Sequence, residues 1–573
     1  MFGWFRDYWR IVVPPKAPSE VDAERWLLVC PLPGERYGSC QCRPFFRYFI
    51  LLAAIASQFV CGVLFALSTV SKPFDFDAFG GHDQGRNMAL GILSGICVAL
   101  TTAFVGPASE RNGPRWSTLL GAGFVALGLL LVQLALWTLT WSPLVLGSVS
   151  LGLAFGYLMV SSISTVQKWY PDARGFAMGA SMAGFGAGQI AWNELSAYAD
   201  DHMDDSVASK NVFLLTLVVL SPLLGYCVLA MRTPPATFRV NGHDMHGIPS
   251  DAVLSAERIQ GDYLDFGMTL VNYTAVTKPR ADAAAPGTER AYYEHVRGLT
   301  LVQCIFSTDF VCLVLAFAAN TTMALLYVEI ATPSLDGLLT SWYNVSLDEA
   351  NAFILHADAV GLAGRFFCPI LSDVLLRALY LNPAYARKLM MLLLLLVPAI
   401  ALPLLHSELD DFGQLKTLIF IVKVCSGGGF AVIGCFLTDL YGVYNMGTMY
   451  GLILMSWSLG MVIVGLVFSG LKRDFVDQVR LMWILSLAGF VFMALVRTDN
   501  MDRFYHGYQY SICGKIIIQR PYKKSKNVRQ SVASIARSTP TPVGGIAPPE
   551  VPRTRYEEPF FLVSSDSETS YVV

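Results

Sequence analysis

The sequence predicts an all-α membrane protein with twelve transmembrane helices arranged in two halves of six. Apolar runs of about twenty residues recur along the chain, and a helix of that length crosses the hydrocarbon core of a bilayer. Only 15% of the 573 residues are charged, whereas soluble proteins carry about 25%. A glycine pattern recurs in the second half of the chain, as expected of a duplicated unit. The net charge of −2 argues against binding to nucleic acid.

Residues 1–47 are polar and carry no signal-peptide pattern, so we expect them to form a cytosolic N-terminal tail. The N-terminal half follows and covers residues 48–231. Its six spans are predicted near residues 48–70, 88–108, 117–138, 143–167, 175–197 and 211–231.

A polar stretch, residues 232–308, is expected to be an unstructured cytosolic central loop. The C-terminal half covers residues 309–497, and its first span begins at Asp309, since an earlier start would place this carboxylate in the middle of the membrane. Its six spans are predicted near residues 310–330, 351–372, 389–405, 417–438, 447–470 and 480–496. Residues 498–573 lack a periodic apolar face and are expected to be a disordered cytosolic tail.

The lysines and arginines near the span ends give the orientation only when the long segments are counted. With both termini in the cytosol, the short inner turns carry seven such residues, and the outer connections also carry seven. Further basic residues near the spans, among them Arg43, Arg47 and Arg232, lie in the tails and the central loop and favour cytosolic termini. Asn344, in an Asn-Val-Ser sequence of a predicted outer loop, is then a candidate glycan acceptor.

Two glycine-rich stretches share one design. KWYPDARGFAMG places a charged turn before Gly175 and Gly179, and DLYGVYNMGTMYG places an aromatic turn before Gly447 and Gly451. The two glycine pairs lie 272 residues apart. Glycines four positions apart on one helix face let two membrane helices approach closely. We therefore expect both pairs at helix–helix contacts.

A second feature recurs at the ends of spans two and eight. GPASERNGPR contains Glu110 and Arg115, and LSDVLLR contains Asp373 and Arg377. The serine–acid pairs of the two segments lie 263 residues apart, close to the offset of the glycine pairs. Two features that recur at similar offsets, six spans apart, indicate a duplicated six-span unit.

The first of these segments resembles the motif of the major facilitator superfamily, G-x-x-x-D-R-x-G-R between spans two and three. Glu110, Arg111, Gly113 and Arg115 match it, with glutamate in place of the usual aspartate. The resemblance covers about residues 45–500, apart from the central loop, and implies a transporter that works by alternating access.

Three segments restrict the resemblance to one group within this superfamily: the KWYPDARG turn, GRFFCPILSD, and the DLYG turn that precedes Gly447. Together they resemble the group that contains oxalate:formate antiporter-like, monocarboxylate transporter-like and nodulin-like proteins. This resemblance implies a monomeric transporter of small organic anions that uses proton coupling or exchange and no cofactor. We expect it in the plasma membrane rather than in an organelle membrane.

The resemblance also implies that the charged turns hold the inner gate closed in one conformational state. Among the implied gating residues, Glu110, Arg111 and Arg115 are expected to cluster at the inner face. The full set of candidate gating residues is Glu110, Arg111, Arg115, Arg174, Asp309, Asp373 and Arg377.

Arg365 is the leading candidate for substrate binding because it lies within the apolar run of span eight. A permanently charged guanidinium is costly there, and it can form a bidentate contact with a carboxylate. Some members of the resembled group place an arginine on span eight for the substrate carboxylate, and the Gly-Arg context matches. The alternative is a structural ion pair with Asp309 or with Asp358, seven residues earlier on the same helix face.

Other polar residues within the spans could line the substrate pathway. The candidates are Asp358, Lys423, Gln58, Tyr157, Ser161, Gln189 and Asn193. Each uncharged side chain could equally bridge two helices, and the lysine could extend its amine towards the outer surface. Span eleven carries no charge, unlike in group members that use a lysine there for a dicarboxylate, so a monocarboxylate is favoured.

Other functional classes fit the sequence less well. An enzyme would need a catalytic constellation, yet the sequence has no phosphate-binding glycine loop and no pair of histidines at metal-ligand spacing. Neither catalytic residues nor a metal site are therefore expected. A fixed-pore channel would not need duplicated gate turns. Two alternatives stay open: a transporter of another small metabolite such as an amino acid, and a nutrient sensor of the same fold that does not transport.

Overall fold

The computed structural model describes most of the chain. The described residues are 8–9, 11, 16–32, 36–69, 84–138, 140–202, 211–235, 237–248, 289–324, 346–379, 381–406, 411–471, 475–503, 507–512 and 515–521. They belong to two compact units, Met1–Val496 and Arg497–Val573. The predicted glycan acceptor Asn344 lies outside the described residues.

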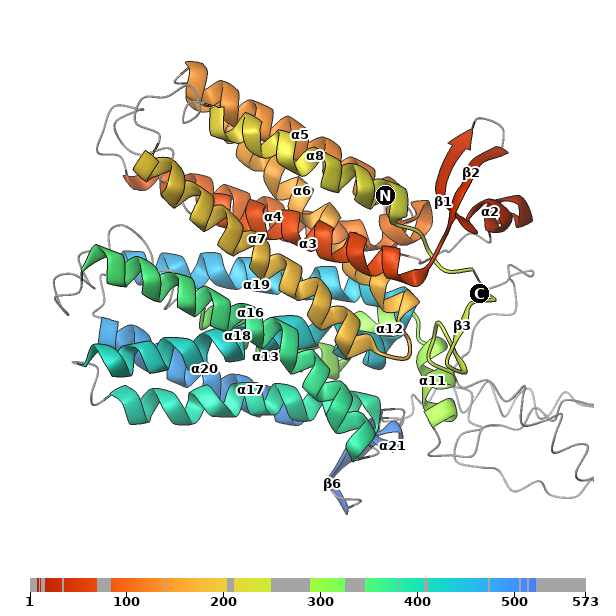
Figure 1. The fold of residues 1–573 in the computed structure, drawn as a ribbon. Helices are drawn as coiled ribbons and strands as arrows, with labels where there is room; N and C mark the ends of the chain where they lie inside the picture. Colours follow the sequence, from red (N-terminus) through yellow and green to blue (C-terminus); the bar gives the residue numbers. More distant parts are fainter. Residues whose placement is uncertain are drawn as a thin grey trace, which may run out of the picture. The chain divides into compact units, whose positions relative to one another are not determined.

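The described part of the first unit contains twelve helices of the membrane fold, in two bundles (Figure 1). The N-terminal half consists of α3 (Arg47–Thr69), α4 (Gln84–Asn112), α5 (Pro114–Thr138), α6 (Trp141–Trp169), α7 (Arg174–His202) and α8 (Val212–Ala230). The C-terminal half consists of α13 (Thr308–Thr322), α16 (Leu347–Ala378), α17 (Pro383–His406), α18 (Phe412–Tyr441), α19 (Val443–Leu471) and α20 (Phe475–Leu495). Ten of these described helices are long and apolar enough to cross a membrane, and α7 and α13 complete the two sets. The predicted fold class is confirmed.

The seventh span begins where the charge of Asp309 predicted. Ser307 precedes α13, and its hydroxyl accepts a hydrogen bond from the backbone N–H of Phe310 at 3.2 Å, which caps the helix. A separate short helix, α12 (Leu301–Ile305), comes before this cap. Asp309 therefore lies in the first turn of α13 rather than halfway along a longer helix.

The expectation of an unstructured central loop is wrong for the residues that the structure describes there. Strands β3 (Arg239–Val240) and β4 (His243–Asp244) form a short antiparallel hairpin, and α11 (Glu289–Arg297) is helical. Tyr292, Tyr293 and Val296 of α11 are buried. Tyr293 and Val296 follow Tyr292 by one and four positions, so the three side chains lie on one face of the helix. This apolar face packs α11 against the bundle.

Two other terminal segments also have local structure. Near the N-terminus, α2 (Pro18–Ala23) precedes a hairpin of β1 (Trp26–Leu32) and β2 (Arg36–Pro44). In the second unit, α21 (Asn500–Arg503) precedes a hairpin of β5 (Gly507–Ile512) and β6 (Lys515–Pro521). Asp502 accepts hydrogen bonds from the backbone and the hydroxyl of Ser511. The expectation of a disordered tail is therefore wrong for these residues.

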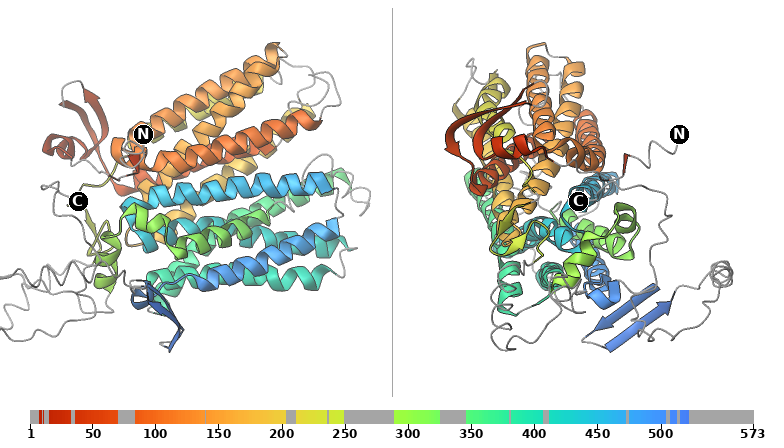
Figure 2. Two further views of the ribbon diagram at one scale, coloured as in Figure 1. Left: turned by 180° about the vertical axis from the view of Figure 1, so that it is seen from behind. Right: turned by 90° about the vertical axis from the view of Figure 1, so that its right-hand side faces the viewer.

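One end of the bundle carries the short turns between helices. We call it the short-turn end, and its described turn residues are 113, 170–173, 379, 381–382 and 442. The β1–β2 hairpin and α11 lie at this end (Figure 2). Arg232, just after α8, binds the backbone carbonyls of residues 24, 26 and 27 at 2.8–3.0 Å and so joins the N-terminal segment to the bundle.

Two repeat-related glycines bring the halves into backbone contact. A Cβ atom on Gly175 of α7 would lie 2.2 Å from the carbonyl oxygen of Pro369 in α16. One on Gly451 of α19 would lie 2.0 Å from the carbonyl oxygen of Thr102 in α4. Real Cβ contacts are not that short, so only glycine permits these contacts. The predicted close helix approach is confirmed at both pairs.

Gly175→Ala should therefore hold the halves apart at the short-turn end. The added methyl group meets a backbone oxygen that cannot move away by a rotamer change, so the contact between α7 and α16 must open. Amide hydrogen exchange of residues 174–180 should increase. Gly123→Ala in α5 is the matched control because a Cβ there meets nothing within 4 Å. Equal protection in both variants would contradict the steric argument.

Candidate functional site

Five polar residues predicted from the sequence meet inside the bundle. Gln189 and Asn193 come from α7, Asp358 and Arg365 from α16, and Lys423 from α18. We call these five residues the central polar cluster. Because α7 belongs to the N-terminal half and α16 and α18 to the C-terminal half, the cluster spans the boundary between the halves.

Arg365 binds neutral groups in this cluster. Its Nη1 donates a hydrogen bond to Oε1 of Gln189 at 2.6 Å, and its guanidinium carbon lies 4.9 Å from the ring centre of Phe185. Its buried Nε has no hydrogen-bond partner among the described residues. The described part of the chain shows no salt bridge to Arg365, and the predicted structural pair with Asp358 is replaced by the contact to Gln189. This partly buried guanidinium thus retains donor capacity and has no directly contacting acid among the described residues.

Asp358 is instead the partner of Lys423. The lysine Nζ lies 2.9 Å from Oδ1 of Asp358, and the side-chain amide of Asn193 donates to Oδ2 at 3.2 Å. Both charged side chains are largely buried. Lys423 therefore points into the bundle rather than towards the membrane surface, and the pair holds a titratable carboxylate across the interface between the halves.

Gln58, Tyr157 and Ser161 do not join the central polar cluster. Gln58 of α3 donates to the hydroxyl of Ser162 in α6 at 2.7 Å. Ser161 donates to a backbone carbonyl at the start of α5 at 3.2 Å, and the ring of Tyr157 stacks on Phe124 of α5 with centres 5.9 Å apart. All three bridge helices within the N-terminal half, which is the alternative that their residue types allowed.

At the short-turn end, Asp439 of α18 binds two arginines. Arg174 of α7 donates from Nη1 to Oδ1 at 2.6 Å, and Arg387 of α17 donates from Nε to Oδ2 at 3.2 Å. The three side chains are no more than 3% exposed. Arg174 belongs to the N-terminal half and the other two residues to the C-terminal half. A buried charge is costly without a partner, so this carboxylate ties the halves together.

Asp373 of α16 makes a second link between the halves. The residue before α7 is Ala173, which has no side chain that could cap the helix. The carboxylate of Asp373 instead accepts from the backbone N–H groups of Gly175 at 3.1 Å and Phe176 at 2.9 Å. It also pairs with Arg387. A carboxylate at a helix N-terminus is stabilised by the unpaired N–H groups and the helix dipole, so one half caps a helix of the other.

Glu110 is buried within the N-terminal half. Lys168 of α6 donates to Oε1 of Glu110 at 2.7 Å, and the hydroxyl of Ser164 donates to the same oxygen at 2.8 Å. Glu110 also lies beside the α19 contact, since a Cβ on Gly447 would lie 3.3 Å from Oε1. The acid of the resembled motif is thus neutralised next to the second contact between the halves.

The expected cluster of Glu110, Arg111 and Arg115 is wrong. Arg111 donates to the backbone carbonyl of Tyr8 at 3.3 Å, and Arg115 donates to the last carbonyls of α8 at 3.1 and 3.3 Å. Neighbouring helix residues point about 100° apart, which separates the first two side chains. Gly113, with a φ of +85°, turns the chain into α5 and places Arg115 beyond it.

The remaining predicted gating residues lie in two places. Arg377 donates to the backbone carbonyl of Asp172 in the α6–α7 turn at 2.8 Å and so crosses between the halves. The carboxylate of Asp172 binds Arg47 at 2.9 Å. Asp309 is buried in the first turn of α13.

The structured part of the central connection covers these charges. The backbone carbonyl of His246 accepts from Arg174 at 3.0 Å, and the hydroxyl of Tyr292 donates to the carbonyl of Asp439 at 2.8 Å. The hydroxyl of Tyr293 lies 3.4 Å from Arg174. A cavity of about 360 Å³ at this site is lined by the same paired charges. Residues 239–248 and α11 therefore belong to the short-turn network.

Three charged residues of the buried ion pairs at the short-turn end are missing from the predicted set: Lys168, Arg387 and Asp439. Sequence spacing could have found one of them, because Arg387 follows Arg115 by the same 272 residues that separate the glycine pairs. Lys168 and Asp439 are the first residues of the two recurring turn segments. Lys168 and Asp439 pair with residues on other helices, however, and no local sequence pattern identifies these partners.

Asp439→Asn should favour separation of the short-turn end. The substitution leaves Arg174 buried without its anionic partner while the halves are together, whereas water solvates it when they separate. Removing one partner of a buried ion pair costs about 3–5 kcal/mol. A cysteine at the buried position of Met178 should then react faster with a water-soluble thiol reagent. Asp477→Asn is the control, because that aspartate forms an exposed pair with Arg480. Unchanged reactivity in Asp439→Asn would contradict the proposed link.

The packing of residues 239–248 should weaken in acid because of His246. Burial lowers the pKa of this imidazole from 6.5 to about 4; Asp244 opposes the shift, and Arg297, Arg174 and Lys168 support it. Since the folded pKa lies below the unfolded value, packing is fully favourable above about pH 6.5 and is lost as the pH falls towards about 4.

Hydrogen exchange of this segment, corrected for intrinsic rates, should therefore increase between about pH 7.5 and about pH 5. His246→Gln should remove the dependence. Equal protection of the wild-type segment at both pH values would show that protonation of His246 does not affect its packing.

Comparison with known proteins places this geometry in a wider context. The sequence model of the Major Facilitator Superfamily matches residues 47–465. The MFS-type transporter pynF of Aspergillus niger is 24% identical over 174 residues, which is 30% of this chain and 39% of that protein. The match thus spans less than half of that relative's length.

Two solved structures share the fold. The proton:xylose symporter XylE bound to 6-bromo-6-deoxy-D-glucose superposes with a TM-score of 0.57 at 14% identity, covering 78% of this chain and 94% of that one. A bacterial homologue of the iron transporter ferroportin, outward-facing with soaked iron, gives 0.52 at 12% identity, with 78% and 98% covered. At these identities the likeness concerns the fold alone.

Proposed function

Because this chain belongs to the Major Facilitator Superfamily, and is therefore a membrane transporter rather than an enzyme, we propose that it carries small monocarboxylates by alternating access. The observation that carries the proposal is Arg365, a partly buried guanidinium at the interface of the halves whose partners are the neutral groups of Gln189 and Phe185. A substrate carboxylate would supply the missing negative charge through a bidentate contact.

The pair of Asp358 and Lys423 is proposed to couple transport to protons. Asp358 lies two helical turns from Arg365 on α16, and its carboxylate joins Lys423 to Asn193 of the opposite half. Protonation of Asp358 would remove the negative charge that balances the lysine and loosen this contact.

The short-turn end is proposed to be the cytosolic gate. Opening it breaks the contacts of Arg174 with Asp439, of Asp373 with α7 and of Arg377 with the α6–α7 turn. Arg387 keeps both of its acids, because these lie in its own half. When the halves separate, Arg387 alone balances Asp373 and Asp439, so the C-terminal half is left with one net negative charge at this site. Water must then solvate both this charge and Arg174.

Uptake into proteoliposomes tests the substrate site directly. Arg365→Lys keeps the charge but loses the planar fork, and it should weaken apparent affinity for monocarboxylates by roughly tenfold or more, the range for a charged hydrogen bond. Arg365→Ala should abolish uptake. The control is Arg480→Ala, which removes an exposed arginine of α20 and should leave uptake unchanged.

Gln189→Glu separates a substrate role from a structural one. The substitution keeps the shape and places a carboxylate where the amide oxygen now lies, 2.6 Å from Arg365. If the arginine binds substrate, this internal anion competes and raises KM strongly while the protein folds normally. Full uptake in Gln189→Glu, or anion affinity retained in folded Arg365→Ala, would exclude Arg365 as the substrate site.

A further inference from the structure

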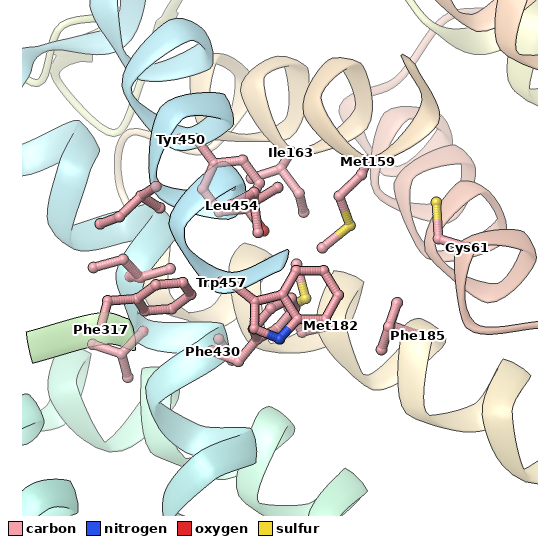
Figure 3. Close-up of a cluster of buried hydrophobic side chains, with 14 of the residues drawn as sticks. Cys61, Met159, Ile163, Met182, Phe185, Phe317, Phe430, Tyr450, Leu454 and Trp457 are labelled. Atoms are coloured by element: carbon pink, nitrogen blue, oxygen red, sulfur yellow. The ribbon is translucent and has the colours of Figure 1, made fainter. Parts of the chain in front are cut away.

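Aromatic side chains from both halves, among them Phe185, Phe430 and Trp457, meet in the core of the bundle (Figure 3). We call Phe65, Phe155, Phe185, Phe430 and Trp457 the aromatic box. The first three belong to the N-terminal half and the last two to the C-terminal half. Its ring centres lie 5.1 Å apart for Phe430 and Trp457, 5.8 Å for Phe185 and Phe430, and 5.7 Å for Phe65 and Trp457.

The aromatic box is continuous with the substrate arginine. Phe185 packs on three other members of the box, and the guanidinium of Arg365 lies over its ring at 4.9 Å from the centre. A ligand carboxylate held by Arg365 would therefore have its remaining atoms against aromatic rings. Aromatic rings favour flat unsaturated partners over small aliphatic ones, because ring faces and edges attract each other in addition to burying area.

A buried hydroxyl beside the box indicates a ligand with a further polar group. Tyr450 of α19 is 0% exposed, and its hydroxyl has no hydrogen-bond partner among the described residues. Its ring lies beside Ile163 and Leu454 in Figure 3. An unpaired buried hydroxyl is unfavourable, so a substrate with a hydroxyl or carbonyl substituent would satisfy it.

We propose that the transported monocarboxylate has an aromatic or similarly flat apolar body. Its carboxylate binds Arg365, its body packs on Phe185, Phe430 and Trp457, and a polar substituent bonds Tyr450. This inference rests on the proposed function and narrows its substrate class.

Competition binding to the full-length protein in detergent or liposomes tests this inference. The probes are acetate, benzoate, the hydroxybenzoates and neutral benzamide. Benzoate should bind at least about tenfold more tightly than acetate. Trp457→Leu should reduce that ratio to near one. In Tyr450→Phe, at least one hydroxybenzoate should lose its advantage over benzoate, while benzoate itself binds as before.

Phe213→Leu is the matched control, because Phe213 is a fully buried ring that stacks on Trp192 between α7 and α8. It should leave the benzoate-to-acetate ratio unchanged. The ratio compares two ligands on one variant, so a partial loss of folded protein cancels. Equal binding of acetate and benzoate, or an unchanged ratio in Trp457→Leu, overturns the inference and leaves the anion function intact. Benzamide binding as tightly as benzoate, independent of Arg365, overturns both.

Discussion

The carboxylate of Asp439 is the contact on which the rest of the structure depends. It is buried at the short-turn end and binds one arginine from each half, Arg174 and Arg387. Charges at such a depth persist only with partners, so the distance between the halves determines whether Arg174 is balanced. Asp373 adds the cap of α7, and Gly175 permits the backbone approach that both contacts need. Together these residues link helix packing to electrostatics at one site.

In the interior of the bundle, Arg365 differs from Arg174 and Arg387 in its partners. There the positive charge is surrounded by an amide and an aromatic ring rather than by an acid. A protein that only needed to hold its helices together would gain nothing from a partly buried guanidinium without a directly contacting acid. We therefore infer that an exogenous anion completes this site. The neighbouring Asp358–Lys423 pair places a carboxylate on the same helix.

The sequence predicts much of the fold because membrane helices and their contacts leave local patterns. The apolar runs predicted the spans. The glycine pairs that contain Gly175 and Gly451, in the two recurring turn segments, predicted close helix contacts, and the structure places these contacts between the halves. Side-chain partners were harder, since they depend on which helices meet. The seven-residue spacing of Asp358 and Arg365 predicted an ion pair between them, but Asp358 pairs with Lys423. Arg115 binds the end of α8, whereas Arg387, the residue at the equivalent position of the second half, belongs to the buried ion pairs. The apolar face of α11 was also missed, because this amphipathic helix has only nine residues and lies within a long polar stretch.

The central claim is that the two halves separate at the short-turn end during transport. The most direct measurement is the distance between spin labels on Trp116→Cys in α5 and Leu379→Cys after α16, two exposed positions in opposite halves. In liposomes during turnover with a transported monocarboxylate, we expect two distance populations, and the longer one should become dominant when Arg174 loses its partner. A single unchanged distance while transport proceeds would contradict the account.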